Sequence, residues 1–295
     1  MKKSLFLVFI VVLCAACGGS HIVVGETAVT GQTADTLSAA RQIRVMGLGN
    51  PLYAPSVQPE YATRPATAIL KFVGKGTVAI VEGCPPPICI LTVGYIDAQN
   101  PDIIVLGGNY FSAMNPEMFG NALNALNYFV KIKRGVLLAF CESEHAATLV
   151  NRIFGSAVSG GLGNEAGSAY RFRFIDDPIL NGTFGDLRSR HWGEDATITA
   201  TLSPAPDSAV VFTYGNTIYT SQVTALRHTS LGFVWVGDSG FLFGNGNDSI
   251  SNPCHYEAGI PAPQIHYGTP VYNSIFYANA IDWAINYVQK NKKHP

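Results

Sequence analysis

The sequence predicts an α/β fold with a mostly parallel central sheet, and three observations support this prediction. Residues 101–145 contain a short apolar run, an amphipathic stretch and a second short apolar run, which is typical of strand, helix and strand. Further short apolar runs lie at 77–81 and 232–236. The chain has 295 residues, 47% hydrophobic and 13% charged, which suits one large α/β domain or two small ones.

The stretch 101–145 is the centre of this prediction. Its first apolar run, 102–106, is short and continuous, as expected for a strand buried on both faces of a parallel sheet. Asn115 is a suitable N-cap, and apolar residues then recur every three or four positions until Gly135, a typical helix stop. The run 136–140 is the second strand. Short connections between these elements favour a right-handed crossover and parallel pairing.

The first residues have the pattern of an export signal. Lys2 and Lys3 precede an apolar run too short to span a bilayer, and small residues then lead to Cys17. This pattern resembles a bacterial lipobox. The resemblance implies a signal peptide over 1–16, lipidation of Cys17 and attachment of the protein to the membrane through an N-terminal lipid anchor. Plain secretion is the alternative. The expected location is the bacterial cell envelope, with the outer membrane as the default.

Residues 17–40 are rich in Gly, Thr, Ser and Ala and predict a flexible tether, so that the domain covers 41–295. The first strand is expected at 43–49 and a helix at 66–72. The Gly47-x-Gly49 sequence lacks the third glycine of a dinucleotide-binding fingerprint, and no cofactor is expected.

Export makes the remaining cysteines candidates for disulfides. Cys84 and Cys89 could close a short loop, and Cys141 and Cys254 allow two other pairings, while four free thiols are the further alternative. The cysteines and histidines lack zinc spacing, and residues 245–248 have too few carboxylates for a calcium loop, so no metal site is expected. The net charge of −1, without a basic stripe, excludes nucleic acid as a partner.

The second half of the chain changes character. After a predicted helix over 145–154 and a glycine-rich loop, alternating segments at 171–175 and 197–202 predict a β-rich insertion. The strand 232–236 is again a continuous apolar run, as expected for a strand buried on both faces of the sheet. Asn273 is expected to cap a last helix whose apolar residues face inward.

The apolar strand 102–106, the helix that ends at 129–135 and the strand 136–140 resemble the class I glutamine amidotransferase-like superfamily, in branches such as the ThuA-like domains. The segments 177–180 and 232–241 and the last helix also match in position. The resemblance implies one flavodoxin-like three-layer sandwich, with the β-rich insertion added in the second half.

The same resemblance implies a catalytic site. Catalytic branches place a nucleophilic cysteine at a strand-to-helix turn, which is the position of Cys141, and a His-x-Glu motif after the last strand. His255 and Glu257 have that spacing, although they lie well beyond Val236, where the family has the motif almost immediately. His145, His191 and His228 are the alternative bases.

Other residues are candidates for ligand binding. Asn109 and Asp238 follow predicted strands, at the carboxyl edge where parallel sheets bind ligands. His191 and Trp192 form an exposed aromatic platform for sugars or, alternatively, a core tryptophan beside a hydrogen-bonded histidine.

Two functions follow from these residues. The first is a membrane-anchored lipoprotein whose non-catalytic domain binds a carbohydrate or another small molecule, or acts in a cell-envelope complex. The alternative is a cysteine-dependent hydrolase or amidase with Cys141 as nucleophile.

Overall fold

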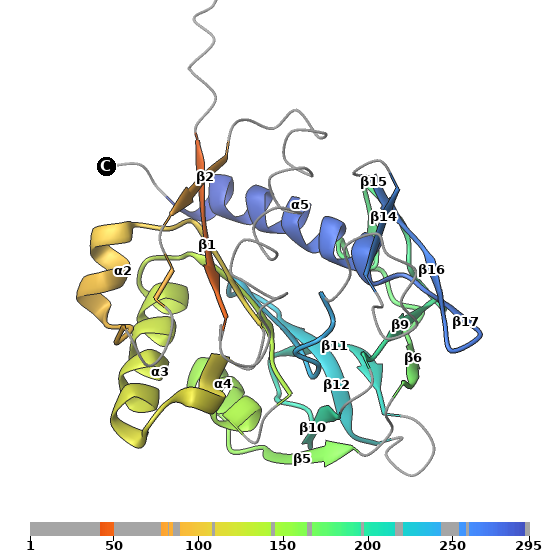
Figure 1. Ribbon diagram of the computed structural model, residues 1–295, viewed down its shortest axis with the longest axis horizontal. Coiled ribbons are helices and arrows are strands. Elements are labelled where there is room, and N and C mark those ends of the chain that lie inside the picture. Colours follow the sequence, from red (N-terminus) through yellow and green to blue (C-terminus); the bar gives the residue numbers. More distant parts are fainter. Residues whose placement is uncertain are drawn as a thin grey trace, which may run out of the picture. The chain divides into compact units, whose positions relative to one another are not determined.

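The computed structural model (Figure 1) describes residues 42–49, 78–81, 83–84, 89–107, 110–142, 145–163, 167–195, 198–215, 221–242, 254–257 and 260–292. All of these residues belong to one compact unit, Ala39–Pro295. The expected helix at 66–72, Cys17, Asn109 and the segment 245–248 lie outside the described residues.

The main sheet has a parallel half that matches the predicted fold. Its five strands pair in the order β2-β1-β3-β4-β13, and every pair is parallel. This is the 2-1-3-4-5 order of flavodoxin-like sheets, so the predicted α/β architecture is confirmed. The strands are β1 (Ile43–Leu48), β2 (Val78–Val81), β3 (Ile103–Leu106), β4 (Val136–Phe140) and β13 (Phe233–Val236).

An antiparallel half continues the sheet beyond β13, as the β-rich pattern of the second half predicts. It contains β5 (Ser159–Gly163), β10 (Thr199–Ser203), β11 (Ala209–Tyr214) and β12 (Val223–His228). The structure also has small two-stranded sheets: β6 (Ala169–Arg171) with β9 (His191–Gly193), β7 (Asn181–Gly182) with β8 (Gly185–Asp186), β14 (His255–Glu257) with β15 (Ile260–Ala262), and β16 (Gln264–His266) with β17 (Thr269–Val271).

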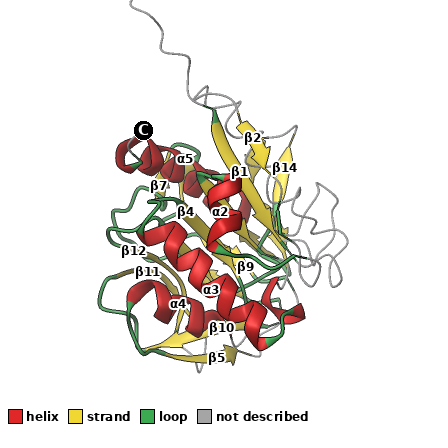
Figure 2. Ribbon diagram, turned by 90° about the vertical axis from the view of Figure 1, so that its left-hand side faces the viewer, coloured by secondary structure: helices red, strands yellow, loops and turns green. Residues whose placement is uncertain are grey.

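Helices cover both faces of the sheet. Figure 2 shows α2 (Val93–Gln99), α3 (Pro116–Lys131) and α4 (His145–Phe154) in front of the strands. The last helix, α5 (Asn273–Asn291), packs on the opposite face, in a separate core. A short 3-10 helix, η1, spans Tyr110–Ala113. In the part of the chain that the structure describes, no helix combines the length and apolar character needed to cross a membrane.

The central helix α3 follows its sequence signals closely. The Asn115 side chain accepts a hydrogen bond from the Met118 N–H at 2.9 Å, and Pro116 is the first helical residue. The helix ends at Lys131, before Gly135. Gly135 is needed for another reason: a Cβ there would lie 2.1 Å from the ring of Phe129.

Two helices differ from what the sequence predicts. No helix is predicted directly before the strand 102–106, but the structure has α2 there, capped by Thr92, whose side chain accepts a hydrogen bond from the Tyr95 N–H. The residue that precedes α5 is Tyr272, and Asn273 is already helical. The Asn273 side chain does not cap the helix because it binds the β-rich insertion instead.

Alternate residues of each central strand enter two separate cores. In β4, Val136, Leu138 and Phe140 pack in the core that contains α5. Leu137 and Ala139 pack in the core that contains α3 and α4, and Cys141 follows them in that core. This period-two alternation decides which layer each residue at the carboxyl edge of the sheet faces.

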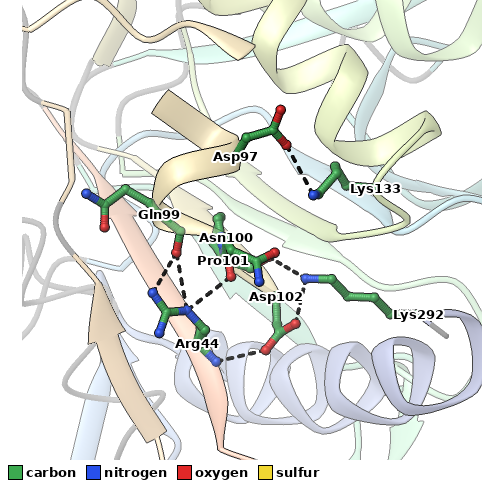
Figure 3. A network of polar contacts seen from close by, with 8 residues as sticks. All are labelled: Arg44, Asp97, Gln99, Asn100, Pro101, Asp102, Lys133 and Lys292. Carbon is green, nitrogen blue, oxygen red and sulfur yellow. Dashed lines mark hydrogen bonds and ion pairs between the residues drawn. The ribbon is translucent and has the colours of Figure 1, made fainter. Parts of the chain in front are cut away.

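A polar network fixes the amino-terminal edge of the parallel strands (Figure 3). Asp102 is fully buried at the start of β3, and Lys292, just after α5, places its Nζ 2.7 Å from Asp102 Oδ1. The backbone N–H of Arg44 donates to Asp102 Oδ2 at 3.0 Å, and its guanidinium donates to the carbonyls of Gln99 and Asn100. The end of α5 is thereby tied to β1 and β3.

Candidate functional site

Two acidic residues follow neighbouring parallel strands at the carboxyl edge of the sheet. The register pairs Val236 of β13 with Phe140 of β4, so Asp238 and Glu142 occupy equivalent positions two residues beyond the strands. Because Val236 and Phe140 both pack in the core that contains α5, alternation points the two carboxylates toward that layer and the insertion.

A third carboxylate comes from the insertion. Asp195 follows β9, and oxygens of Glu142, Asp195 and Asp238 all lie within 4.8 Å of one another. We call these three residues the carboxylate cluster. Asp195 and Asp238 are buried, whereas Glu142 is half-buried.

Asn273 and Gly240 place Asp195 in the cluster. Asn273 is fully buried, accepts a hydrogen bond from the Gly193 N–H and donates to the Gly193 and Phe241 carbonyls, at 2.8, 2.8 and 3.1 Å. It therefore joins the end of β9 to the segment after β13. Gly240 lets that segment approach closely, because a Cβ at this position would lie 2.0 Å from Asp195 Oδ2.

Asp238 is the most unusual member of the cluster. Its Oδ1 accepts a hydrogen bond from the Gly240 N–H at 2.7 Å, while its buried Oδ2 has no hydrogen-bond partner among the described residues. Burial, followed by the charges of Asp195, Glu142 and Glu194, raises the pKa of Asp238 well above its usual value, and the Gly240 N–H opposes this rise. The surroundings of Asp238 therefore have an excess of negative charge.

Cys141 is placed as a core residue. Only 2% of its surface is exposed, and it packs in the core with α3 and α4. Burial raises the pKa of the Cys141 thiol to about 12, against the smaller lowering effect of the contact with Trp235. A thiol in this state is protonated at neutral pH and is a poor nucleophile.

The structure does not bring His255 and Glu257 together with Cys141. Both lie in β14, whose hairpin packs against α5, and His255 Nε2 is 3.6 Å from Glu257 Oε1. The Cys141 side chain faces the opposite layer, and Figure 1 shows the β14–β15 hairpin far from α3 and α4. The His-x-Glu spacing is therefore present without the geometry of a triad.

Two of the three alternative histidines, His145 and His228, pack against phenylalanine rings. The ring of His145 packs 4.2 Å from that of Phe119. The ring of His228 packs 4.6 Å from that of Phe154, and His228 Nδ1 accepts hydrogen bonds from the Ser230 and Leu231 N–H groups at 3.1 Å.

The expected sugar platform at His191 and Trp192 is not exposed. Trp192 is fully buried, its ring is stacked 4.4 Å from Tyr170, and its Nε1 donates to Thr213 Oγ1 at 3.1 Å. This is the core alternative, and it removes the platform. His191 is half-buried, and burial followed by the charge of Arg171 lowers its pKa.

A groove on the surface of α5 contains aromatic residues that the sequence analysis did not select. The rings of Trp283 and Tyr287 lie 5.6 Å apart, and the surrounding cavity of about 330 Å³ is also lined by Ser230, Asn286 and Asn291. We call this feature the α5 groove. Its signal was present in the sequence, because Trp283 and Tyr287 are four residues apart on a helix and lie outside the apolar stripe.

The cysteines at 84 and 89 form a disulfide, with Cα atoms 5.1 Å apart, whereas Cys141 and Cys254 are free and buried. Of the disulfide pairings that the sequence left open, the structure therefore contains the one between Cys84 and Cys89, which closes a short loop. Burial also raises the pKa of the Cys254 thiol to about 12.

No family model and no curated protein matches this sequence. Among solved structures, the chain is similar to a ThuA-like protein from Parabacteroides merdae, with a TM-score of 0.48 and 12% identity over 86% of this chain and 94% of that one. The strand order and the two helical layers establish the fold as α/β and flavodoxin-like.

Proposed function

We propose that this protein is a lipid-anchored cell-envelope protein whose α/β domain binds carbohydrate in the α5 groove, without cysteine catalysis. The single observation that carries the binding proposal is the half-buried pair Trp283 and Tyr287 in a cavity that is also lined by amides, hydroxyls and Lys290.

The chemistry of the α5 groove suits a sugar. A pyranose has an apolar face, which packs on aromatic rings, and hydroxyls at its edge, which need donors and acceptors. Asn286 and Asn291 contribute amides, which offer both, and Ser230 contributes a hydroxyl. A volume of about 330 Å³ is at the lower end of small-molecule sites, so a mono- or disaccharide fits best.

The groove is also preorganised. The Tyr287 hydroxyl donates to the Ser230 carbonyl at 3.2 Å, and the Arg227 guanidinium lies over the Trp283 ring, 5.9 Å from its centroid. Arg227 is itself held by Asp177 at 2.7 Å. These contacts fix both rings, which lowers the entropic cost of binding.

Tryptophan fluorescence tests this proposal directly. The chain has three tryptophans, and Trp192 and Trp235 are fully buried, so ligand-induced changes report mainly on Trp283. We expect one or more mono- or disaccharides to shift the emission of the full chain in detergent. Tyr287→Ala should weaken binding about tenfold or more, and calorimetry should show the same loss for Trp283→Ala.

The matched control is Phe174→Ala, which removes an aromatic side chain that is 75% exposed elsewhere on the surface. This variant should bind as the wild type does. A broad sugar panel that gives neither a fluorescence nor a calorimetric signal would remove the support for carbohydrate binding, as would equal affinities for all three variants.

Two observations support the proposed location. The segment before Cys17 resembles a lipobox, and the Cys84–Cys89 disulfide is of a kind that persists in oxidising compartments. Metabolic labelling with a radioactive fatty acid should mark the protein in the membrane fraction, and Cys17→Ser should abolish the label. Retention of the label in that variant would contradict anchoring at Cys17.

The burial of Cys141 supports a binding role rather than the hydrolase alternative. The proposed histidine partner also lies elsewhere, since Cys141 packs in the core with α3 and α4 whereas the His255 hairpin packs on α5.

A further inference from the structure

We propose that Glu142, Asp195 and Asp238 bind a divalent cation of the calcium class at the carboxyl edge of the parallel strands. This site is separate from the α5 groove and does not depend on carbohydrate binding. Its ligands come from three segments of the chain: the end of β4, the end of β13 and the β-rich insertion.

The chemistry of the ligand atoms favours calcium. Oxygens of all three carboxylates lie within 4.8 Å of one another, close enough to contact one shared ion. Carboxylate oxygens are the ligands that hard cations prefer, and Ca²⁺ tolerates irregular arrangements of them, whereas Mg²⁺ demands a near-ideal octahedron.

A second observation, independent of the clustering, points to a missing partner. Asp238 is fully buried, and its Oδ2 has no hydrogen-bond partner among the described residues. Within the described part of the chain, the charged groups that act on it are Asp195, Glu142 and Glu194, all of them acidic. Buried charges in proteins are either paired or bound to metal, and here a cation would supply the missing partner.

The local backbone is built to bring these charges together. Gly240 has no side chain, and a Cβ there would occupy the space of the Asp195 carboxylate. Asn273 holds the Gly193 end of β9 in place with two hydrogen bonds of 2.8 Å. Holding like charges together in this way is unfavourable unless a cation or a proton compensates. Glu142 is half-buried and marks the side from which a cation can enter.

Calorimetry on the full chain, purified in detergent and stripped with a chelator, tests the proposal. We expect one Ca²⁺ per chain, weaker binding of Mg²⁺, and a melting temperature that rises with Ca²⁺ concentration because the ion binds the folded state. Asp238→Asn keeps the shape of the side chain and should abolish both the binding and the thermal shift. Asp207→Asn, in an exposed turn, is the matched control and should behave as the wild type.

Two further results keep the test decisive. If Asp238→Asn does not fold, Glu142→Gln, which changes a half-exposed residue, should weaken Ca²⁺ binding at least tenfold. The proposal is overturned if the wild type binds neither Ca²⁺ nor Mn²⁺ at millimolar concentrations, since a proton shared within the cluster would then be the compensating charge. Unchanged Ca²⁺ affinity in both variants would overturn it equally.

Discussion

Two buried aspartates lie at opposite edges of the same parallel sheet, and the charged groups around them are of opposite sign. Asp102, at the amino-terminal edge, is fully buried and has the Lys292 ammonium at 2.7 Å (Figure 3). Asp238, at the carboxyl edge, is also fully buried, but the charges of the described residues that act on it are all acidic. The first aspartate is paired with a cation of the chain itself, and we assign it a structural role. Among the described residues the second has no such cation, and our proposal supplies one from solution.

The largest effect should come from breaking the pair at the amino-terminal edge. Lys292→Met leaves the Asp102 carboxylate buried without its cation, which should lower the free energy of unfolding by about 3–5 kcal/mol. Chemical denaturation measures this loss. Adding Asp102→Asn to that variant should recover a large part of it, because the uncompensated charge is then removed.

A loss below about 1 kcal/mol for Lys292→Met would mean that water or another group already compensates Asp102. It would contradict the contrast drawn between the two edges of the sheet.

The next effect concerns Gly240 and a matched glycine. Gly240→Ala places a methyl group against the Asp195 carboxylate, which should lower the free energy of unfolding by about 1–3 kcal/mol. Gly120→Ala, in α3, meets no atom within 4 Å and should instead stabilise by about 0.5–1 kcal/mol because alanine is the better helix former. Destabilisation of equal size in both variants would show that packing at the carboxylate cluster is not the cause.

Asp238 should respond to substitution in the opposite direction from Asp102. In chelator at neutral pH, Asp238→Asn should raise the free energy of unfolding by about 1–2 kcal/mol, because the uncompensated charge is lost. The pH dependence follows from the raised pKa of Asp238. The folded state holds this proton more tightly than the unfolded state, so the stabilisation is complete below the unfolded pKa and is lost as pH rises through the folded pKa.

The difference in unfolding free energy between Asp238→Asn and the wild type should therefore grow with rising pH when Ca²⁺ is absent. Denaturation curves at a series of pH values measure it. A difference that stays constant with pH would show that Asp238 does not change its protonation in this range.

The last prediction concerns the reactivity of the two free thiols, with no change in stability. Because the pKa of Cys141 and of Cys254 is about 12, a thiol-specific reagent at pH 7.5 should label neither in the folded protein and both after unfolding. Peptide mapping identifies the labelled residues. Rapid labelling of Cys141 in the folded state would restore the nucleophile hypothesis.

The parallel half of the fold was predictable because its signals are local. The run 102–106, the Asn115 cap and the apolar stripe of α3 each depend on neighbouring residues, and all agree with the structure. The carboxylate cluster was predictable only in part. Asp238 was selected because it follows a buried strand, but its pairing with Glu142 depends on the register of β13 with β4, which strand patterns do not specify.

Asp195 and Trp192 show where local reasoning fails. Asp195 is placed in the cluster by the hydrogen bonds between Asn273 and Gly193. These two residues are eighty positions apart in the chain, and no local sequence pattern predicts such a contact. Trp192 has an aromatic ring that suits either a core or a sugar platform, and only its burial against Tyr170 decides between them.

The central claim is that the carboxylate cluster at the carboxyl edge of the sheet binds a cation from solution, whereas Asp102 at the amino-terminal edge is paired with Lys292. It is tested most directly by measuring the melting temperature of the wild type, Asp238→Asn and Lys292→Met in chelator and in saturating Ca²⁺. The account predicts that Ca²⁺ raises the melting temperature of the wild type and, from a lower starting value, that of Lys292→Met, but leaves Asp238→Asn unchanged. The same melting temperature with and without Ca²⁺ in all three proteins would contradict it.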